Sequence, residues 1–244
     1  MSLTAKLFLS PVLVAQAIST RARLPRLPEP EGERCGVVGR GQPLQLLITG
    51  DSSAAGVGVG SQRDALAQRL AATLAAAAPA CVNWRLHARS GLTTAQTLGL
   101  LRELGQHAAD VAVVVTGVND VVDQVPSRRA LAAREALANW LRNGQGVQHV
   151  VFAPLPPIHH FPGLPQPLRW VAGADARRHN AVLKEWTATR NDVSCVDMDV
   201  PLNRGVMAAD GFHPGEPVYR YCANAIARHI ASHVFPHLHL DTSP

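Results

Sequence analysis

The chain has 244 residues, of which 47% are hydrophobic and 17% charged, and this composition fits a globular protein and argues against disorder. The formal net charge of +5 is spread thinly along the sequence, and only 5% of the residues are aromatic. The sequence has no basic stripe interleaved with aromatic residues, so the composition gives no support to a nucleic-acid partner.

The first 42 residues are predicted to precede the folded domain. Lys6 is followed by the apolar run Leu7–Ile18, which Pro11 interrupts, and three arginines follow between positions 21 and 26. The run is too short to span a bilayer. Ala15-Gln16-Ala17 has the form of a signal-peptidase site, but the arginines beyond it disfavour translocation. We therefore expect an uncleaved arm that docks on the domain or contacts a membrane peripherally, and a cytoplasmic or inner-membrane location rather than a periplasmic or secreted one.

Residues 24–42 contain prolines, glycines and charges, so they are predicted to be a linker. The periodic sequence begins after it. We place the folded domain at residues 43–236 and a C-terminal tail at 237–244.

From residue 44 onward, apolar runs typical of strands alternate with helical patterns. The predicted strands are 44–49, 82–88, 111–116, 147–153 and 193–198. The predicted helices are 64–78, 93–107, 128–142, 175–190 and 216–233, with a long loop over 154–173. Alternating strands and helices indicate parallel pairing in a sheet that is covered on both faces. We therefore predict an α/β domain with a five-stranded parallel sheet.

The stretch Gly50-Asp51-Ser52-Ser53 follows the first predicted strand and precedes a glycine-rich run. Open α/β sheets keep their ligand sites at the carboxyl ends of their strands, so a polar side chain there is a candidate for chemistry. We interpret Ser52 as a nucleophile. The alternative is that Asp51 and Ser52 only cap the next helix.

A nucleophilic serine needs a base and a group that orients the base, and Asp210-Gly211-Phe212-His213 supplies both. A carboxylate three residues before an imidazole can accept a hydrogen bond from Nδ1–H, which leaves Nε2 facing the serine hydroxyl. The alternative for Asp210 and His213 is a loop that caps the last helix.

The same edge of the sheet offers donors for an oxyanion. Asn119 follows the third strand and carries two amide N–H groups, and the backbone N–H of Gly91 follows the second strand. Each residue also fits an ordinary turn, so neither motif is specific by itself.

Taken together, these four segments resemble the SGNH (GDSL-like) hydrolase family over about residues 44–235. The matching residues are Ser52, Gly91, Asn119, and Asp210 with His213. The family's leucine after the nucleophile is replaced here by Ser53, which remains a second candidate nucleophile. The resemblance implies a three-layer α/β/α sandwich of flavodoxin-like strand order. It also implies hydrolysis of an ester or thioester through an acyl-enzyme on Ser52, with no cofactor or metal and with oxyanion donors from Ser52, Gly91 and Asn119.

The loop over 154–165 is apolar and proline-rich, and it follows a strand at the predicted catalytic edge. We expect Phe161, Leu164 and Trp170 to line an acyl pocket, the alternative being a lid that packs on the core. The expected substrate is a small-molecule or lipid-like ester. Deacetylation of a carbohydrate or cell-wall ester is an alternative reaction, and a non-catalytic flavodoxin-like binding module is an alternative of another class.

Three other hypotheses find little support. The glycine run 56–60 lacks the acidic residue that a dinucleotide site needs, and no serine lies in a G-x-S-x-G frame. The histidines at 159–160 and 237–239 have no carboxylate or cysteine that would complete a metal site. The four cysteines show no C-x-x-C pair, so we expect mainly buried free thiols: Cys35, Cys81, Cys195 and Cys222.

Overall fold

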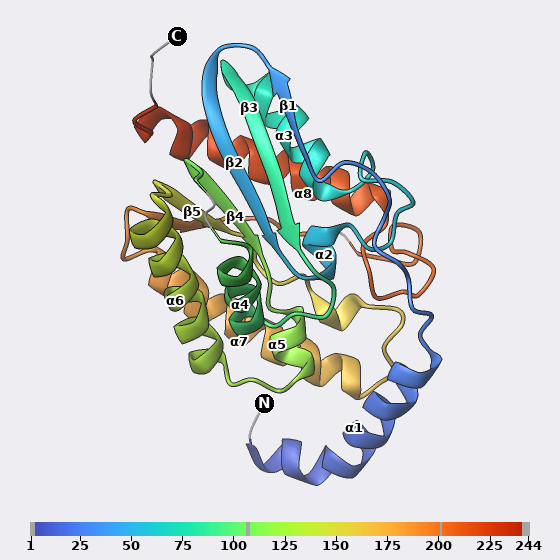
Figure 1. The fold of residues 1–244 in the computed structure, drawn as a ribbon. Helices are drawn as coiled ribbons and strands as arrows, with labels where there is room; N and C mark the ends of the chain where they lie inside the picture. The colour runs from blue at the N-terminus through green and yellow to red at the C-terminus, as the bar shows by residue number, and fades with distance from the viewer. Residues whose placement is uncertain (1–2, 106–107, 201, 241–244) are drawn as a thin grey trace.

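The computed structural model describes residues 3–105, 108–200 and 202–240. A single sheet runs through the molecule in the strand order β1-β3-β2-β4-β5-β6 (Figure 1). Its strands are β1 (Cys35–Gly39), β2 (Gln42–Gly50), β3 (Ala80–Ala88), β4 (Val111–Val115), β5 (His149–Phe152) and β6 (Val193–Cys195). The strands β2 to β6 pair in parallel, as the alternating sequence pattern predicts.

The helices cover both faces of this sheet. The longer ones are α1 (Leu3–Arg23), α3 (Leu66–Ala77), α4 (Thr94–Leu104), α6 (Ser127–Gln145), α7 (Leu168–Thr187) and α8 (Glu216–His229). The short ones are α2 (Ser52–Ala55), α5 (Val118–Val122), the 3₁₀ turns η1 (Ile158–His160) and η3 (Phe235–His237), and the π-helical turn η2 (Ile230–Val234). None of the helices in the described part of the chain is long and apolar enough to cross a membrane.

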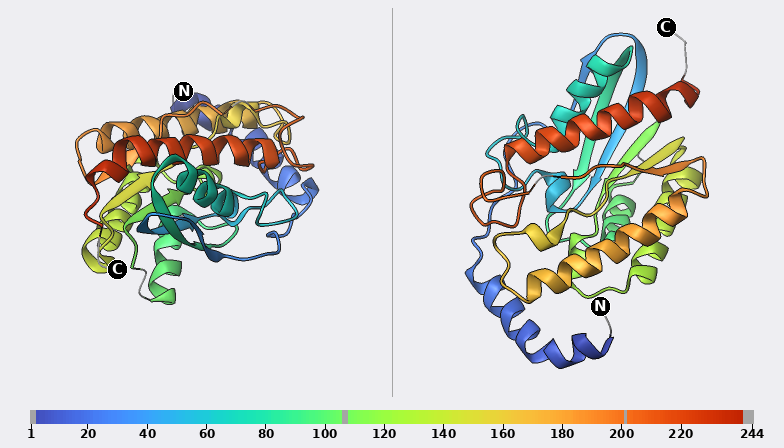
Figure 2. Two further views of the ribbon diagram at one scale, coloured as in Figure 1. Left: turned by 90° about the horizontal axis from the view of Figure 1, so that it is seen from above. Right: turned by 180° about the vertical axis from the view of Figure 1, so that it is seen from behind.

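The core is divided by the sheet into two layers, and β2 contributes to both. Leu44, Leu46 and Ile48 pack against α3 and α8, whereas Leu47 points to the other face with α4, α6 and α7. This alternation follows from the period of two along a strand. Figure 1 shows α4 and α6 in front of the sheet and α8 behind it, and the view from behind in Figure 2 brings α8 to the front. The three-layer α/β/α prediction is confirmed.

One strand was not expected from the sequence. Residues 35–39, inside the predicted linker, form β1, which pairs antiparallel with β3 at the edge of the sheet. The sheet therefore has six strands rather than five and is not wholly parallel. β1 gives a weak sequence signal because it is short and half-exposed. A Cβ on Gly36 would lie 3.0 Å from Trp84 Nε1, so the Trp84 ring packs closely on this strand.

Other boundaries also differ. α7 begins at Leu168, seven residues before the predicted start, so the long loop is shorter than expected. The predicted helix over 93–107 ends at Leu104 in α4, and residues 106–107 lie outside the described part of the chain, as do residues 241–244 of the predicted tail. All four cysteines are free, as expected, but Cys35 is exposed on β1 and Cys81, Cys195 and Cys222 are only partly buried.

Candidate active site

The turn after β2 presents Ser52 as the first residue of α2. Gly50 precedes it with φ +152°, and a Cβ there would lie 1.9 Å from the carbonyl oxygen of Val115, so only glycine allows this close approach. Asp51 caps α2, because its Oδ1 accepts a hydrogen bond from the Ser53 N–H at 2.9 Å. The capping interpretation therefore holds for Asp51 and leaves the hydroxyl of Ser52 available.

His213 connects Ser52 to a buried carboxylate. Its Nε2 lies 3.2 Å from Ser52 Oγ, and its Nδ1 lies 2.5 Å from Asp210 Oδ2. The Asp210 side chain is 1% exposed and that of His213 20%. A proton on Nδ1 donates to Asp210, so Nε2 is left to accept a proton from the serine hydroxyl.

The Asp210 carboxylate is held ionised by local hydrogen bonds. Burial raises its pKa, but the hydrogen bonds from the His213 ring and from the backbone N–H groups of His213 and Phe212 outweigh that effect and bring the pKa below its ordinary value. A carboxylate that stays negative near neutral pH favours a positive charge on the neighbouring imidazole.

The loop that carries these two residues is fixed by close backbone packing. The Gly211 carbonyl accepts a hydrogen bond from Gly163 N–H at 2.9 Å, and Ala208 N–H donates to the His213 carbonyl at 2.9 Å. A Cβ on Gly58 would lie 2.1 Å from the carbonyl oxygen of Pro214. The absence of a side chain on Gly58 thus allows the loop of His213 and Pro214 to approach the segment that follows Ser52.

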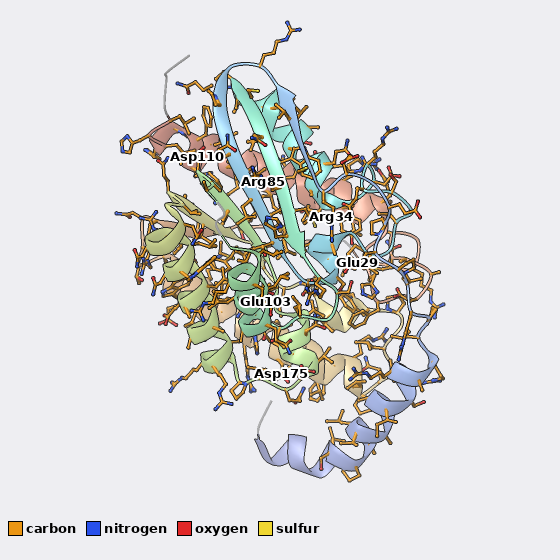
Figure 3. All side chains as sticks on the ribbon, in the orientation of Figure 1. Glu29, Arg34, Arg85, Glu103, Asp110 and Asp175 are labelled. Carbon is orange, nitrogen blue, oxygen red and sulfur yellow. The ribbon has the colours of Figure 1, made fainter. Side chains whose placement is uncertain are left out.

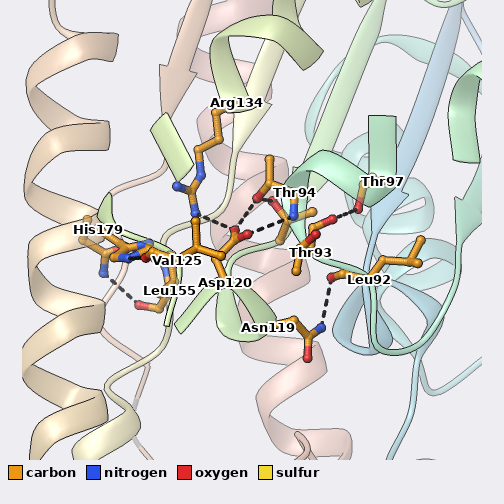
Figure 4. A network of polar contacts seen from close by, with 12 residues as sticks. Leu92, Thr93, Thr94, Thr97, Asn119, Asp120, Val125, Arg134, Leu155 and His179 are labelled. Atoms are coloured by element: carbon orange, nitrogen blue, oxygen red, sulfur yellow. Dashed lines mark hydrogen bonds and ion pairs between the residues drawn. The ribbon is translucent and has the colours of Figure 1, made fainter. Parts of the chain in front are cut away.

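Strand register brings the two candidate oxyanion donors to the same edge. Gly50 is paired with Ala88 on one side and with Val115 on the other, so the segments that follow all three strands begin level with one another. Gly91, with φ +83°, and Asn119, at the start of α5, lie in two of these segments. Asn119 Nδ2 donates one hydrogen bond to the Leu92 carbonyl at 3.0 Å (Figure 4), and the second N–H of this amide remains available to a ligand.

The region of the chain that contains these residues matches a known enzyme family. The sequence profile of the GDSL-like lipase/acylhydrolase family matches residues 48–221, which include Ser52, Asn119 and His213. The chain belongs to this family. A comparison with curated proteins finds no match.

Solved structures with a similar fold include lipases and an esterase. A lipase from a goat rumen metagenome, Lip_vut3, has a TM-score of 0.61 at 21% identity and covers 78% of this chain and 98% of its own. A lipolytic G-D-S-L protein from Veillonella parvula DSM 2008 has a TM-score of 0.58 at 17% identity, covering 80% and 99%. A carbohydrate esterase family 2 enzyme with its carbohydrate-binding domain, from Corynascus thermopiles (Myceliophthora fergusii), has a TM-score of 0.62 at 14% identity, covering 87% and 69%. At these identities the similarity concerns the fold, and the family supports an ester-hydrolysing enzyme.

Beneath Asn119, this GDSL-like hydrolase holds a buried charge pair that sequence reasoning missed. Asp120 accepts hydrogen bonds from the backbone N–H of Thr94 at 3.2 Å and from its hydroxyl at 2.5 Å (Figure 4). Arg134 Nη2 lies 4.0 Å from Asp120 Oδ2, and its side chain is 1% exposed. The pair joins α5 to α6, and the hydrogen bonds from Thr94 join α5 to the start of α4. α5 carries Asn119, and α4 follows the segment that contains Gly91. Asp120 follows Asn119 directly, but nothing in the sequence singles out Arg134 on α6.

Asp51 is the other buried acid of the hydrolase site. Desolvation raises its pKa to about 7, against 3.8 ordinarily, although the hydrogen bond from Ser53 acts in the opposite direction. At neutral pH a large share of Asp51 is therefore protonated, whereas Asp210 is ionised. The two aspartates have different roles: Asp51 shapes the turn and Asp210 faces His213.

The residues expected to form an acyl pocket lie in different surroundings. Phe161 and Leu164 are buried in a core cluster, 3% and 8% exposed, and Trp170 is 48% exposed on the first turn of α7. Phe161 packs edge-on against Phe212, with ring centroids 5.3 Å apart, and Phe212 packs in the same way against His213 at 5.2 Å. Phe161 thus contacts the loop that carries Asp210 and His213 through the ring of Phe212. Contact between substrate and these three residues stays a prediction.

An apolar cavity of about 70 Å³ lies behind the turn that carries Ser52. Asp51 and Ser53 form part of its wall, and Phe161, Leu164 and Trp170 do not line it. Its apolar lining comes largely from the carboxyl ends of the strands and from α8: Val115, Leu155, Met198, Val218, Cys222 and Ile226. Among the residues that the structure describes, no three His, Cys, Asp or Glu side chains are placed to hold one metal ion.

Proposed function

We propose that this chain is a serine acyl hydrolase that cleaves a carboxylic ester or thioester through an acyl-enzyme on Ser52. The observation that carries the proposal is the hydrogen-bonded series Ser52 Oγ, His213 Nε2, His213 Nδ1 and Asp210 Oδ2, with separations of 3.2 Å and 2.5 Å. Ser53 is less suited as the nucleophile, because it is Ser52 Oγ that lies within hydrogen-bond distance of the imidazole.

The reaction proceeds in two halves on this geometry. His213 Nε2 takes the proton of the Ser52 hydroxyl as Oγ forms a bond to the ester carbonyl carbon, and Asp210 stabilises the imidazolium. The N–H groups of Ser52, Gly91 and Asn119 stabilise the oxyanion. His213 then gives its proton to the leaving alkoxide or thiolate, and in the second half it activates the water that releases the acid.

The substrate is proposed to be recognised through its acyl group. The family is that of GDSL-like lipases and acylhydrolases, which favours an acyl substrate. An apolar cavity borders Asp51 and Ser53, although neither Ser52 nor His213 lines it. Removal of an acetyl group from a carbohydrate remains the second candidate, because it uses the same triad and an enzyme with a similar fold is a carbohydrate esterase.

Labelling with a fluorophosphonate tests the proposal directly. We expect the wild-type chain to be labelled at Ser52, the Ser52→Ala variant to lose labelling, and the Ser53→Ala variant to keep it. The rates of hydrolysis of p-nitrophenyl esters, from acetate to dodecanoate, are then compared with the rate for an acetylated sugar. This comparison identifies the substrate class. A wild-type chain that resists labelling and hydrolyses none of these esters would support the non-catalytic binding module instead.

A further inference from the structure

Helix α1 lies at the end of the molecule to which the carboxyl ends of the strands point. Figures 1 and 2 show it beyond α5 and the start of α7, outside the layers that cover the sheet. It is attached through Gln16, whose Nε2 donates to the Gln166 carbonyl at 2.6 Å and whose Oε1 accepts from Leu168 N–H at 3.1 Å. Thr20, one turn further on the same side, is buried. The helix therefore has a defined inner side at the catalytic end of the domain.

The outer side of α1 is apolar and open to solvent. Val14 and Ile18 are 57% and 66% exposed, which places them among the most exposed large apolar residues of the described chain. Val14 and Ile18 are four residues apart and so lie on one stripe of the helix. Adjacent exposed apolar residues on one helix face mark an interaction surface more often than isolated ones do.

The charge of this segment favours one kind of partner. Arg21 and Arg23 lie in the last turn of α1 and Arg26 follows, all three exposed. The sequence contains no acidic residue before Glu29. A helix with an apolar outer face and a basic end suits the interface of an anionic bilayer, where apolar side chains enter the headgroup region and arginines meet lipid phosphates.

We propose that the outer side of α1 docks the hydrolase peripherally on an anionic lipid surface. Docking there would place the catalytic edge of the sheet next to the bilayer. This docking does not require Ser52 to be catalytic, so a measurement of lipid binding alone can test it.

The test is co-sedimentation of the full chain with vesicles of phosphatidylcholine, with and without phosphatidylglycerol. We expect binding to the anionic vesicles that weakens with salt, and loss of binding in Ile18→Glu. Replacing Arg21, Arg23 and Arg26 by glutamine should weaken binding roughly a hundredfold, at about fivefold for each of the three charges. Val37→Glu, which changes an equally exposed valine on β1, is the matched control and should bind as the wild type does.

Two results would overturn the proposal. One is equal sedimentation of the wild type and Ile18→Glu with anionic vesicles. The other is a wild-type dimer that Ile18→Glu converts to a monomer while neither binds vesicles, because the face would then belong to a second copy. Far-ultraviolet circular dichroism of each variant shows that the domain has remained folded.

A second inference rests on a separate observation at Glu29. Glu29 Oε1 accepts hydrogen bonds from the backbone N–H of Ser90 at 2.7 Å and from its hydroxyl at 2.8 Å. Glu29 Oε2 accepts from Arg34 Nη2 at 3.1 Å, and the same nitrogen donates to the Ala88 carbonyl at 3.1 Å. Figure 3 shows Glu29 and Arg34 beside each other near the end of β3. The segment before β1 therefore binds the loop that follows β3.

The same loop is also held on its other side, where Asn119 Nδ2 donates to the Leu92 carbonyl at 3.0 Å. Gly91 comes directly after Ser90, is exposed, and has no atom within 4 Å of the position of a Cβ. Arg89 N–H makes a longer bond of 3.3 Å to the Gly50 carbonyl. Glu29 thus supplies the shortest hydrogen bonds to the loop that carries the Gly91 N–H. It lies outside residues 48–221, the region that the family profile covers.

We infer that Glu29 is a positioning residue that fixes the Gly91 N–H toward the oxyanion. The inference rests on the proposed function. Removing an oxyanion donor outright costs about 10²–10³ in kcat, so displacing one should cost less, on the order of tenfold.

The test compares Glu29→Ala, Glu29→Gln and Ser90→Ala on a short p-nitrophenyl ester. We expect Glu29→Ala to lower kcat about tenfold with KM changed less than about twofold, because the oxyanion forms only after substrate has bound. Glu29→Gln keeps a side-chain acceptor and should recover part of the loss, and Ser90→Ala should lose less than Glu29→Ala. Glu33→Ala, an exposed glutamate of the same segment, is the control.

Thermal unfolding of each variant separates positioning from folding. A Glu29→Ala variant with the wild-type kcat would contradict the inference. So would a variant whose lower activity comes from a higher KM and a lower Tm. If the wild type itself shows neither turnover nor labelling, the proposed function has failed and not the role of Glu29.

Discussion

The imidazole of His213 lies 3.2 Å from the hydroxyl of Ser52, although 161 positions separate the two residues in the chain. The contact joins the turn after β2 to the loop before α8, and it orders the hydroxyl, imidazole and carboxylate as acyl transfer on serine requires.

Replacing Asp210 by asparagine should disable the site without unfolding the protein. Asparagine can retain the shape of the loop, but it favours the wrong tautomer of His213 and leaves no negative charge beside the imidazolium. We expect kcat to fall by about 10³–10⁴ with little change in Tm. Steady-state kinetics of Asp210→Asn measure the loss, and Asp123→Asn, an exposed carboxylate, is the control. A variant that keeps a tenth of the wild-type kcat would contradict the role of Asp210.

Replacing Asn119 by alanine should lower kcat while leaving substrate binding intact. The amide is held by Leu92 through one N–H, so its other N–H is oriented before the oxyanion forms. We expect a loss of about 10²–10³ in kcat and a nearly unchanged KM. Near-wild-type turnover of folded Asn119→Ala on a short aryl ester would exclude the residue from the oxyanion hole.

The stability of the protein should depend on pH through Asp51. Because desolvation raises its folded-state pKa to about 7 from 3.8, the folded chain binds more protons than the unfolded chain between these values. The contribution of Asp51 to the free energy of unfolding is then complete below pH 4 and is lost as the pH rises through 7. Asp51→Asn removes that loss, since asparagine is neutral and still caps α2.

We expect Asp51→Asn to be more stable than the wild type at pH 8 by about 1–3 kcal/mol, with the difference shrinking toward pH 4. Urea unfolding at a series of pH values measures it. A difference that is independent of pH would show that Asp51 titrates normally.

Breaking the buried pair of Arg134 and Asp120 should destabilise the fold. Arg134→Leu leaves the Asp120 carboxylate buried, with Thr94 as its hydrogen-bond partner. We expect a loss of about 3–5 kcal/mol in the free energy of unfolding. The double variant Arg134→Leu with Asp120→Asn should recover part of it, because no buried charge is left alone. Denaturant titration measures the free energy of unfolding of the single and the double variant. If the two values are equal, Arg134 and Asp120 are not energetically coupled.

Much of the site followed from the sequence because its signals are local. Each candidate residue comes directly after an apolar run, and parallel strands bring their carboxyl ends to one edge whatever the details of packing. Ser52, Gly91 and Asn119 could therefore be placed at the same edge from the pattern alone. The D-x-x-H spacing of Asp210 and His213 is also local, and the structure gives it the expected hydrogen bond.

Only the tertiary structure decided which side chains surround that edge. Glu29 and Ser90 are 61 positions apart, and no periodicity relates them. Phe161 lies in an apolar loop, which suits a substrate pocket and the core equally, and only the structure places its ring against Phe212. The sequence determined the order of the elements and the chemistry at their ends, since these depend on neighbours along the chain. Burial, the pairing of Arg134 with Asp120 and the edge strand β1 depend on neighbours in space, which emerge only when the chain has folded.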